Sequence, residues 1–378
     1  MRIICKKSNL VKGVSIVSKA VPSKTTMPIL ECILIDATTD VIKLTANDME
    51  LGIETTIDGI IDSRGIIALN AKIFSEIVRK LPDNDVVIET ESDNQAIITC
   101  EKAKFNIAAQ SGDDFSYLPA IEREDFITIS EFTLKEVVRQ TIFSIADNDT
   151  NKMMTGELFE IDNDVLRVVS LDGHRISIRK IELKDAYQPR KVIVPGKTLQ
   201  EISKIIGGEA DAEVEISFTK NHIVFEFDRT LVVSRLIEGE YFRIDQMLSS
   251  DYDTKVSVNK KEFLDCIDRA TLLVREGDKK PIVIEIKDNS MELKIDGQIC
   301  DLKAGSIAVP GYDAARLADP EACREGRSLK IPIPATPRND ALVGFACDPH
   351  AAGGFNDALH TAELSAEGSA LIGGTVRL

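Results

Sequence analysis

Apolar residues recur along the chain with two periods, one helical and one extended. Three segments have the 3.6-residue spacing of an amphipathic helix, and their starts lie about 125 residues apart. They are 8–21, 132–146 and 258–274. Leu10, Val14 and Val17 share one face of the first, and Asn259 is placed to cap the third.

Each of these helices precedes the same strand–turn–strand pattern. In 28–48, 153–173 and 279–297, alternating β-branched residues lead into an Asp/Asn turn and out again, which is typical of a hairpin. A second helix is predicted at 70–81 and at 195–206. Further hairpins are predicted at 85–100 and 213–227.

The chain therefore reads as an α+β protein of three domains, 1–125, 126–250 and 251–378, each with two helices packed on antiparallel sheets. Three unrelated α+β domains are the alternative. Matching order, spacing and turn chemistry favour duplication, and long-period repeats are typical of arrays or closed rings.

The repeat ends after about residue 295. A second helix is due near 320–333, but 319–334 reads DPEACREGRSLKIPIP, with no apolar stripe and with Pro332 and Pro334. No further strands are legible there apart from the final TVRL. The tail could be a divergent half-domain, a grafted segment or a sequence error.

The formal net charge is −16, which argues against a protein that grips nucleic acid through bulk electrostatics. No apolar stretch reaches the ~20 residues of a membrane span, and the N-terminus has no signal-peptide core, so we expect no membrane partner. Seven scattered cysteines favour reduced thiols and a cytoplasmic location.

Basic residues nevertheless recur on the polar faces of equivalent helices, at i and i+4 or i and i+7. If these helices line one cavity, that cavity is positive inside an acidic body. The alternative is ordinary solvation of exposed helix faces, which the acidic residues on the same helices support. Sparse cations suit weak, sequence-independent phosphate contacts. The residues are Lys12, Lys19, Lys72, Arg79, Lys135, Arg139, Lys197 and Lys204.

No catalytic or metal-binding constellation is recognisable. Cys347 and His350 have C-x₂-H spacing, but Cys323 and His360 do not complete a zinc site or a nucleophile pair. Segment 147–151 (DNDTN) lacks the glycine and terminal acid of a calcium loop. We expect no catalytic residues, no metal and no cofactor.

Several phrases carry a family resemblance: KAVPSKTTMPIL (19–30), LTANDMELGIE (44–54), VSLDGHRISI (169–178), VIVPGKTLQEI (192–202) and LIEGEYFRIDQML (236–248). The chain resembles the bacterial β sliding clamp, the DNA polymerase III β subunit, over residues 1 to about 295. The resemblance implies a head-to-tail homodimer that encircles duplex DNA and has no catalytic activity. It also implies a clamp loader as partner, and replicative and repair polymerases that dock a short peptide into a cleft.

The resemblance also implies residue roles. Lys24 matches a basic position that touches DNA. Phe242 stands where relatives often have proline. The implied peptide cleft is Met154, Leu171, Gly173, His174, Arg175, Ile176, Phe242 and Met247, with Val376, Arg377 and Leu378 from the C-terminus. The implied dimer contact joins Ile73, Ile77, Phe105 and Ile107 to Leu272 and Leu273 of a second copy.

Two other functions remain open. One is an enzyme whose site lies in the divergent tail, carried on a clamp-like scaffold. The other is a monomeric adaptor that binds replication peptides without encircling DNA. Both depend on residues 296–378, where the family pattern is lost.

Overall fold

The computed structural model describes residues 1–91, 95–119, 121, 126–147, 151–173, 175–247, 255–257, 260–272, 282–287, 290–295, 302–308, 341–345, 369–371 and 376–377. These residues form two compact units, each described by itself. Unit 1 comprises residues 1–138 and 197–237, and unit 2 comprises residues 139–196 and 238–378. The three predicted domains, with limits at 125 and 250, stay a prediction.

Unit 1 is built on one thirteen-stranded sheet, in the order β10-β13-β14-β15-β4-β3-β2-β6-β9-β8-β7-β1-β5. All of its pairs are antiparallel. The strands are β1 (Arg2–Lys6), β2 (Cys32–Asp36), β3 (Ile42–Asn47), β4 (Leu51–Ile57), β5 (Ile60–Ser63), β6 (Ile66–Asn70), β7 (Asp85–Glu91), β8 (Gln95–Cys100), β9 (Ala103–Ser111), β10 (Phe126–Ser130), β13 (Glu213–Phe218), β14 (His222–Phe227) and β15 (Thr230–Arg235).

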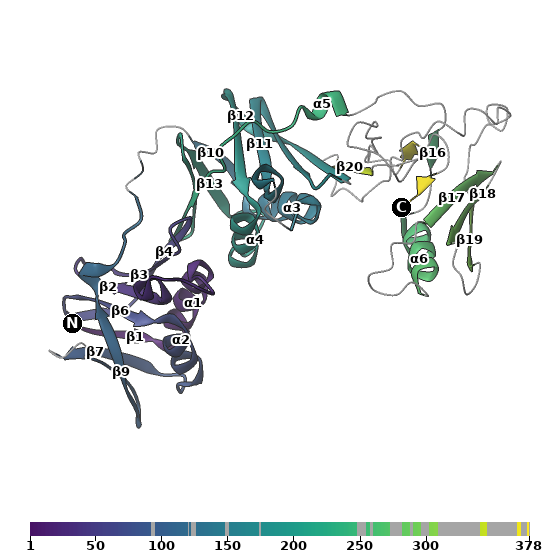
Figure 1. Cartoon of the computed structure of the whole chain (residues 1–378). Helices are drawn as coiled ribbons and strands as arrows, with labels where there is room; N and C mark the ends of the chain where they lie inside the picture. The colour runs from purple at the N-terminus through teal and green to yellow at the C-terminus, as the bar shows by residue number, and fades with distance from the viewer. Residues whose placement is uncertain are drawn as a thin grey trace. The chain divides into compact units, whose positions relative to one another are not determined.

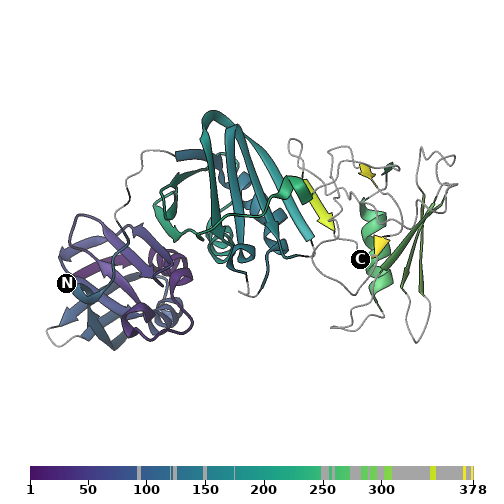
Figure 2. The same ribbon diagram turned by 45° about the horizontal axis from the view of Figure 1, so that its top comes forward.

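The first predicted helix is α1 (Lys7–Val17), extended by the 3₁₀ turn η1 (Ser18–Ala20). It packs against α2 and against β3 and β4 (Figure 1, Figure 2). Gly13 allows this close approach, because a Cβ there would stand 2.6 Å from Ile57 Cγ2 and 2.8 Å from Leu44 Cδ1. The predicted apolar stripe is therefore the buried face.

The other predicted helices also form, with ends shifted by a few residues. They are α2 (Ala71–Lys80), α3 (Glu131–Thr141) followed by η4 (Ile142–Ser144), α4 (Gly196–Ile205) and α6 (Lys260–Thr271). The side chain of Asn70 caps α2 by accepting from the Ile73 amide at 3.2 Å. Ser130 does the same for α3, accepting from the Thr133 amide at 3.1 Å. Asn259, the predicted cap of α6, lies outside the described residues.

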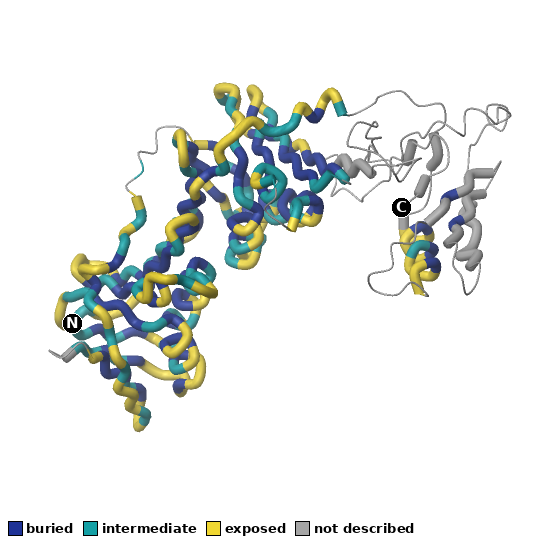
Figure 3. Tube along the Cα trace, viewed as in Figure 1, coloured by how far each residue is buried: buried dark blue, intermediate teal, exposed yellow. Residues whose placement is uncertain are grey.

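Short 3₁₀ turns connect several elements: η2 (Pro28–Glu31), η3 (Gly112–Asp114) and η5 (Lys152–Thr155). Buried residues follow the strands and the helix faces that lie on them, and the loop tips are exposed (Figure 3). Leu10, Phe74, Leu134 and Leu199, one from each of the first four helices, are fully buried. Burial of this apolar face supplies most of a short helix's stability.

Unit 2 contains β11 (Gly156–Leu171) and β12 (Arg175–Pro195), which pair antiparallel in two blocks. Residues 156–161 pair with 190–195 and residues 165–171 pair with 176–182, with an irregular register between Ile161 and Val165. Glu160 and Arg167 of β11 form an ion pair at 3.2 Å. Seven residues of straight strand would separate them by about 23 Å, so the chain reverses between them. Asn163, with φ 55°, provides that reversal. The hairpin predicted within 153–173 is therefore confirmed.

The remaining elements of unit 2 are α5 (Ile244–Met247), β16 (Lys255–Ser257), β17 (Ile282–Lys287), β18 (Ser290–Ile295), β19 (Leu302–Ala308), β20 (Ala341–Phe345), β21 (Ser369–Leu371) and β22 (Val376–Arg377). The hairpin predicted at 279–297 is β17–β18. Helix α6 packs beside β18 and β19 (Figure 1).

Strands occur after residue 295, where the sequence pattern indicated none apart from the final TVRL. β19 extends the β17–β18 hairpin, β22 pairs with β17, β21 pairs with β16, and β20 pairs with β12 (Figure 2). The expectation of a tail without legible strands before the final TVRL is therefore wrong at β19, β20 and β21, whereas β22 lies within TVRL. Those three strands were missed because backbone pairing does not require a strong apolar alternation. The second helix due near 320–333 falls outside the described residues.

Substitutions at Asn163 test whether the chain reverses direction within β11. Replacing it with valine should lower the free energy of unfolding by about 1–2 kcal/mol, because a β-branched residue is strained at positive φ. Asn163→Gly should change it by less than about 0.5 kcal/mol, because glycine tolerates that region. Urea denaturation of the full chain measures both. Equal losses in the two variants would contradict a left-handed residue at this turn.

Candidate functional site

The basic residues predicted to face DNA lie mostly on the helices of unit 1. Lys12 is on α1, Lys19 in η1, and Lys24 in the loop after it. Lys72 and Arg79 are on α2, Lys135 on α3, and Lys197 and Lys204 on α4. Arg139, at the other end of α3, belongs to unit 2. Lys19 and Lys135 are partly buried and the other seven are exposed.

Several of these cations already have partners. Lys197 Nζ lies 2.5 Å from Asp48 Oδ2, and Glu201 lies 2.8 Å from Lys204 and 4.0 Å from Lys19. Lys135 Nζ donates to the carbonyls of Ile206 and Gly207, which end the α4 segment. Among the described residues, Lys24, Lys72 and Arg79 have no ion-pair partner. The positive face predicted from the sequence is therefore partly neutralised.

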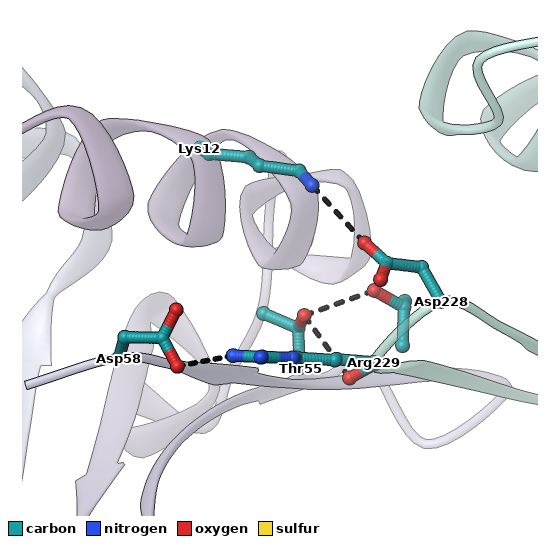
Figure 4. A network of polar contacts seen from close by, with 6 residues as sticks. Lys12, Thr55, Asp58, Asp228 and Arg229 are labelled. Atoms are coloured by element: carbon teal, nitrogen blue, oxygen red, sulfur yellow. Dashed lines mark hydrogen bonds and ion pairs between the residues drawn. The ribbon is translucent and has the colours of Figure 1, made fainter.

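Lys12 belongs to a polar network at the place where β15 pairs with β4 (Figure 4). We call the residues of this network the seam: Lys12, Thr55, Asp58, Asp228, Arg229 and Thr230. Lys12 Nζ reaches across from α1 to Asp228 Oδ2 at 3.0 Å, and Arg229 pairs with Asp58. The buried hydroxyls of Thr55 and Thr230 are 2.9 Å apart.

The carbonyl oxygen of Arg229 accepts two hydrogen bonds at the seam. It accepts from the Thr56 amide at 3.1 Å and from the Thr55 hydroxyl at 3.3 Å. A cavity of about 200 Å³ lies beside it, lined by Asn9, Lys12, Gly13, Ile16, Thr55, Thr56, Ile57, Asp58, Asp228 and Arg229. Its two acids and two bases balance, so it has no preference for either sign of ligand.

Part of the predicted peptide cleft assembles in unit 2. The described structure brings Leu171 and Ile176 into one buried apolar cluster, with Met154, Phe242 and Met247 packed against it. We call this group, together with the five residues named in the next sentence, the cleft cluster. Sequence reasoning missed Leu158, Val169, Ile178, Tyr241 and Ile244. The period-2 alternation of 169/171 and 176/178 could have indicated Val169 and Ile178.

Polar groups border the cleft cluster. Arg175 donates from Nε to Asp172 Oδ2 at 2.9 Å, and its guanidinium lies 5.5 Å from the Phe143 ring centroid. Gly173, between them, has φ 88°. A hydrogen bond from Arg167, at 2.9 Å, lowers the pKa of Asp245.

The remaining predicted cleft residues are not placed in the cluster. Val376 and Arg377 form β22, which pairs with β17. His174 and Leu378 lie outside the described residues.

The dimer-contact residues that the structure describes remain accessible. Ile73 is 50%, Phe105 38% and Leu272 76% exposed, and Ile77 and Ile107 are half-buried. Leu273 lies outside the described residues. These side chains are accessible to another molecule, and their role in a dimer contact stays a prediction.

Behind the cleft cluster, Glu157 is fully buried, and Thr141 Oγ1 donates to its Oε2 at 2.9 Å. Burial raises the pKa of Glu157 to about 8, and the Thr141 hydrogen bond opposes that rise. Burial also raises the pKa of Tyr241, with a smaller contribution from the charge of Glu157. Glu157 thus holds its proton at neutral pH.

Within the described residues, no group of three or more His, Cys, Asp or Glu side chains could hold a metal ion. Cys323, Cys347, His350 and His360 lie outside them. The described cysteines, Cys5, Cys32, Cys100 and Cys266, are buried free thiols. No helix of the described parts is long and apolar enough to span a membrane.

Comparison with known proteins agrees with this architecture. Residues 1–119 match the model of the DNA polymerase III beta subunit N-terminal domain, and residues 128–242 match that of the central domain. A beta sliding clamp of Staphylococcus aureus is 33% identical over 301 residues, covering 78% of this chain and 80% of the relative.

Solved structures are also similar. A crystal structure named as a DNA polymerase III beta subunit of Eubacterium rectale is 57% identical, with TM-score 0.83, covering 100% of this chain and 99% of that one. The Bacillus subtilis DNA polymerase sliding clamp is 34% identical, with TM-score 0.80, covering 84% and 86%. The fold is thus that of the DNA polymerase sliding clamps. The chain belongs to the bacterial beta sliding clamp family, the beta subunits of DNA polymerase III. The family, the α+β clamp fold and the sliding-clamp function predicted from the sequence are confirmed.

The threonine pair tests the seam. Thr55→Val should lower the free energy of unfolding by about 1–3 kcal/mol, because it leaves the buried Thr230 hydroxyl without its partner. Thr55→Val with Thr230→Val should recover most of that loss, since two apolar groups of matching shape then meet. Urea denaturation of the single and double variants gives the coupling. Additive losses would show that the hydroxyls do not depend on each other.

Glu157 makes stability depend on pH. Between its unfolded pKa, near 4.5, and its folded pKa, about 8, the folded chain keeps a proton that the unfolded chain has lost. Stability from this group is therefore lost as pH rises through that window. Between pH 6 and 9 the wild type should lose about 2 kcal/mol relative to Glu157→Gln. Denaturation midpoints of both chains across this range provide the measurement, and parallel profiles would contradict the shift.

Proposed function

We propose that this chain forms a head-to-tail homodimeric ring that encircles duplex DNA and keeps a replicase from dissociating. One observation carries the proposal. β9 and β15 are equivalent strands, but of the two only β15 pairs along both of its edges with neighbouring strands in the described structure. Both belong to two-residue hairpins, Cys100 pairing with Ala103 and Phe227 with Thr230. Their turns begin at Glu101 and Asp228, with φ 50° and 49°.

β15 continues the sheet by pairing with β4. Residues 103–108 of β9 pair with β8, whereas β6 takes only residues 109–111 on the other side. Within the described part of the chain, that edge of 103–108 stays open. An open edge beside exposed Phe105 suits a strand supplied by a second molecule.

β19 is the natural partner. It follows the β17–β18 hairpin as β4 follows β2–β3, and it lies at the edge of its sheet. We therefore pair β19 of one copy with β9 of the other. Phe105 and Ile107, with Ile73 and Ile77, would then meet Leu272 and Leu273 of the second copy.

The DNA contact would be weak and independent of sequence. Lys12, Lys19, Lys197 and Lys204 share their charge with acids, so few free cations remain to hold phosphate. Retention is then topological, because leaving a closed ring requires opening an interface. The candidates for direct contact are Lys24, Lys72 and Arg79.

The cleft cluster would dock a short peptide of a replicative or repair polymerase or of the clamp loader. Apolar pockets bordered by ion pairs bind peptides through hydrophobic anchors, and the charges set the orientation. We also propose that the protein is cytoplasmic, has no catalytic activity and uses no cofactor.

Retention on DNA tests the ring. The full chain, loaded on nicked circular DNA by a clamp loader with ATP, should stay bound at salt concentrations that screen phosphate contacts. Cutting the circle should release it. Equal retention on circular and linear DNA would contradict a topological hold and favour an adaptor.

The open edge predicts the oligomeric state. Sedimentation of the wild type should give about twice 41.6 kDa. Phe105→Asp should shift the protein toward monomer, because it buries a charge at the contact. Ile60→Asp is the matched control, since Ile60 is exposed on β5, away from the proposed contact. A monomeric wild type would contradict the ring.

A further inference from the structure

A layer of buried polar side chains backs the cleft cluster. Side chains alternate along β11 and β12, so the residues between the cluster members point to the opposite face of the sheet. Those positions hold Glu157, Ser170, Ser177 and Arg179, each 0–1% exposed. Apolar residues normally fill such positions, since burying polar groups is costly unless they are paired.

Thr141, at the end of α3, joins this layer to the helix. Its hydroxyl donates to Glu157 at 2.9 Å, and its carbonyl accepts from the Ser170 hydroxyl at 2.6 Å. The hydroxyls of Ser144 and Ser177 meet at 2.6 Å. Both halves of β11, and β12 beside them, are thereby tied to α3 and η4.

Glu157 is the member whose state can change. Its Oε1 has no hydrogen-bond partner among the described residues, and no cation contributes to its titration. The charge of Glu157 acts on Tyr241, in the 238–243 segment, and Arg179 lies in the same layer from β12. Thr141 and Gln140, from α3, are neutral. An ionised carboxylate here would have one hydrogen bond in place of water.

The polar residues of this layer are sequence neighbours of cleft-cluster residues. Leu158 follows Glu157, and Ser170 stands between Val169 and Leu171. Tyr241 donates to the Val169 carbonyl at 3.4 Å and meets Phe242 edge to face, with ring centroids 5.8 Å apart. A shift of β11 against α3 therefore moves the walls of the pocket.

We propose that Glu157 is a positioning residue of the peptide cleft, holding β11 against α3 through Thr141 and so fixing Leu158, Leu171 and Tyr241. The proposal rests on the docking function proposed above. Because the raised pKa of Glu157 is about 8, its ionisation in mildly alkaline solution should loosen the layer and weaken docking.

Peptide affinity as a function of pH tests this. The probe is a fluorescein-labelled peptide from the clamp-docking segment of the host's replicative polymerase, followed by anisotropy on the full chain. Wild-type Kd should rise about tenfold from pH 6.5 to 9, and Glu157→Gln should change less than about twofold. Thr141→Val should weaken docking already at pH 6.5, because it removes the hydroxyl through which Glu157 holds β11, and should move the remaining transition to higher pH, because that hydroxyl lowers the pKa of Glu157. Glu240→Gln, an exposed acid beside Tyr241, should keep the wild-type profile.

A second readout does not need the peptide. With ¹³C-methyl methionine, the Met154 and Met247 signals should titrate near pH 8 in the wild type and not in Glu157→Gln. Met27, exposed in unit 1, is the control that should not titrate. Matching profiles in wild type and Glu157→Gln, with static methyl signals, would overturn the positioning role. A folded wild type that binds no peptide at pH 6.5 would instead overturn the docking function, and this proposal with it.

Discussion

Backbone pairing between β15 and β4 is the constraint on which the rest of unit 1 depends. Its five residue pairs join positions that lie 175 to 183 residues apart into one sheet. They also fix Thr230 opposite Thr55, and they bring the Asp228–Arg229 turn within reach of α1. The side-chain contacts of the seam follow from this register, since a shift of one residue would turn every side chain to the other face. In unit 2, β20 pairs with β12 in the same antiparallel sense.

Much of this fold could be predicted from the sequence because it is local. The 3.6-residue stripes of α1 to α4 and the Asp/Asn turns, including the reversal at Asn163, depend only on neighbours in the chain. The partners of Lys12 and Lys197 were not predictable, because Asp228 and Asp48 lie 216 and 149 residues away. Strands β19 to β21 were missed for a related reason: pairing with other strands, rather than their own apolar alternation, defines them.

The cleft shows the same limit in another form. Family resemblance indicated Leu171, Ile176 and Phe242, and the structure brings them together. It did not indicate Glu157, Ser170 or Ser177, because polar residues that alternate with apolar ones in a strand ordinarily face water. Here both faces of the sheet are covered, so the polar set forms an internal layer. Only the structure, in which η4 packs on β11 and β12 and Thr141 bonds to Glu157 and Ser170, reveals that these groups are buried.

The open edge of β9 has a consequence for how these molecules assemble. A contact that joins β9 of one copy to β19 of the next is heterologous, and nothing in such a contact limits the number of copies. Whether two copies close on each other or many continue into a fibre depends on the angle between successive subunits. That angle decides between a finite assembly and an endless one, so a substitution that bends the sheet at the seam would alter the assembly without touching the contact.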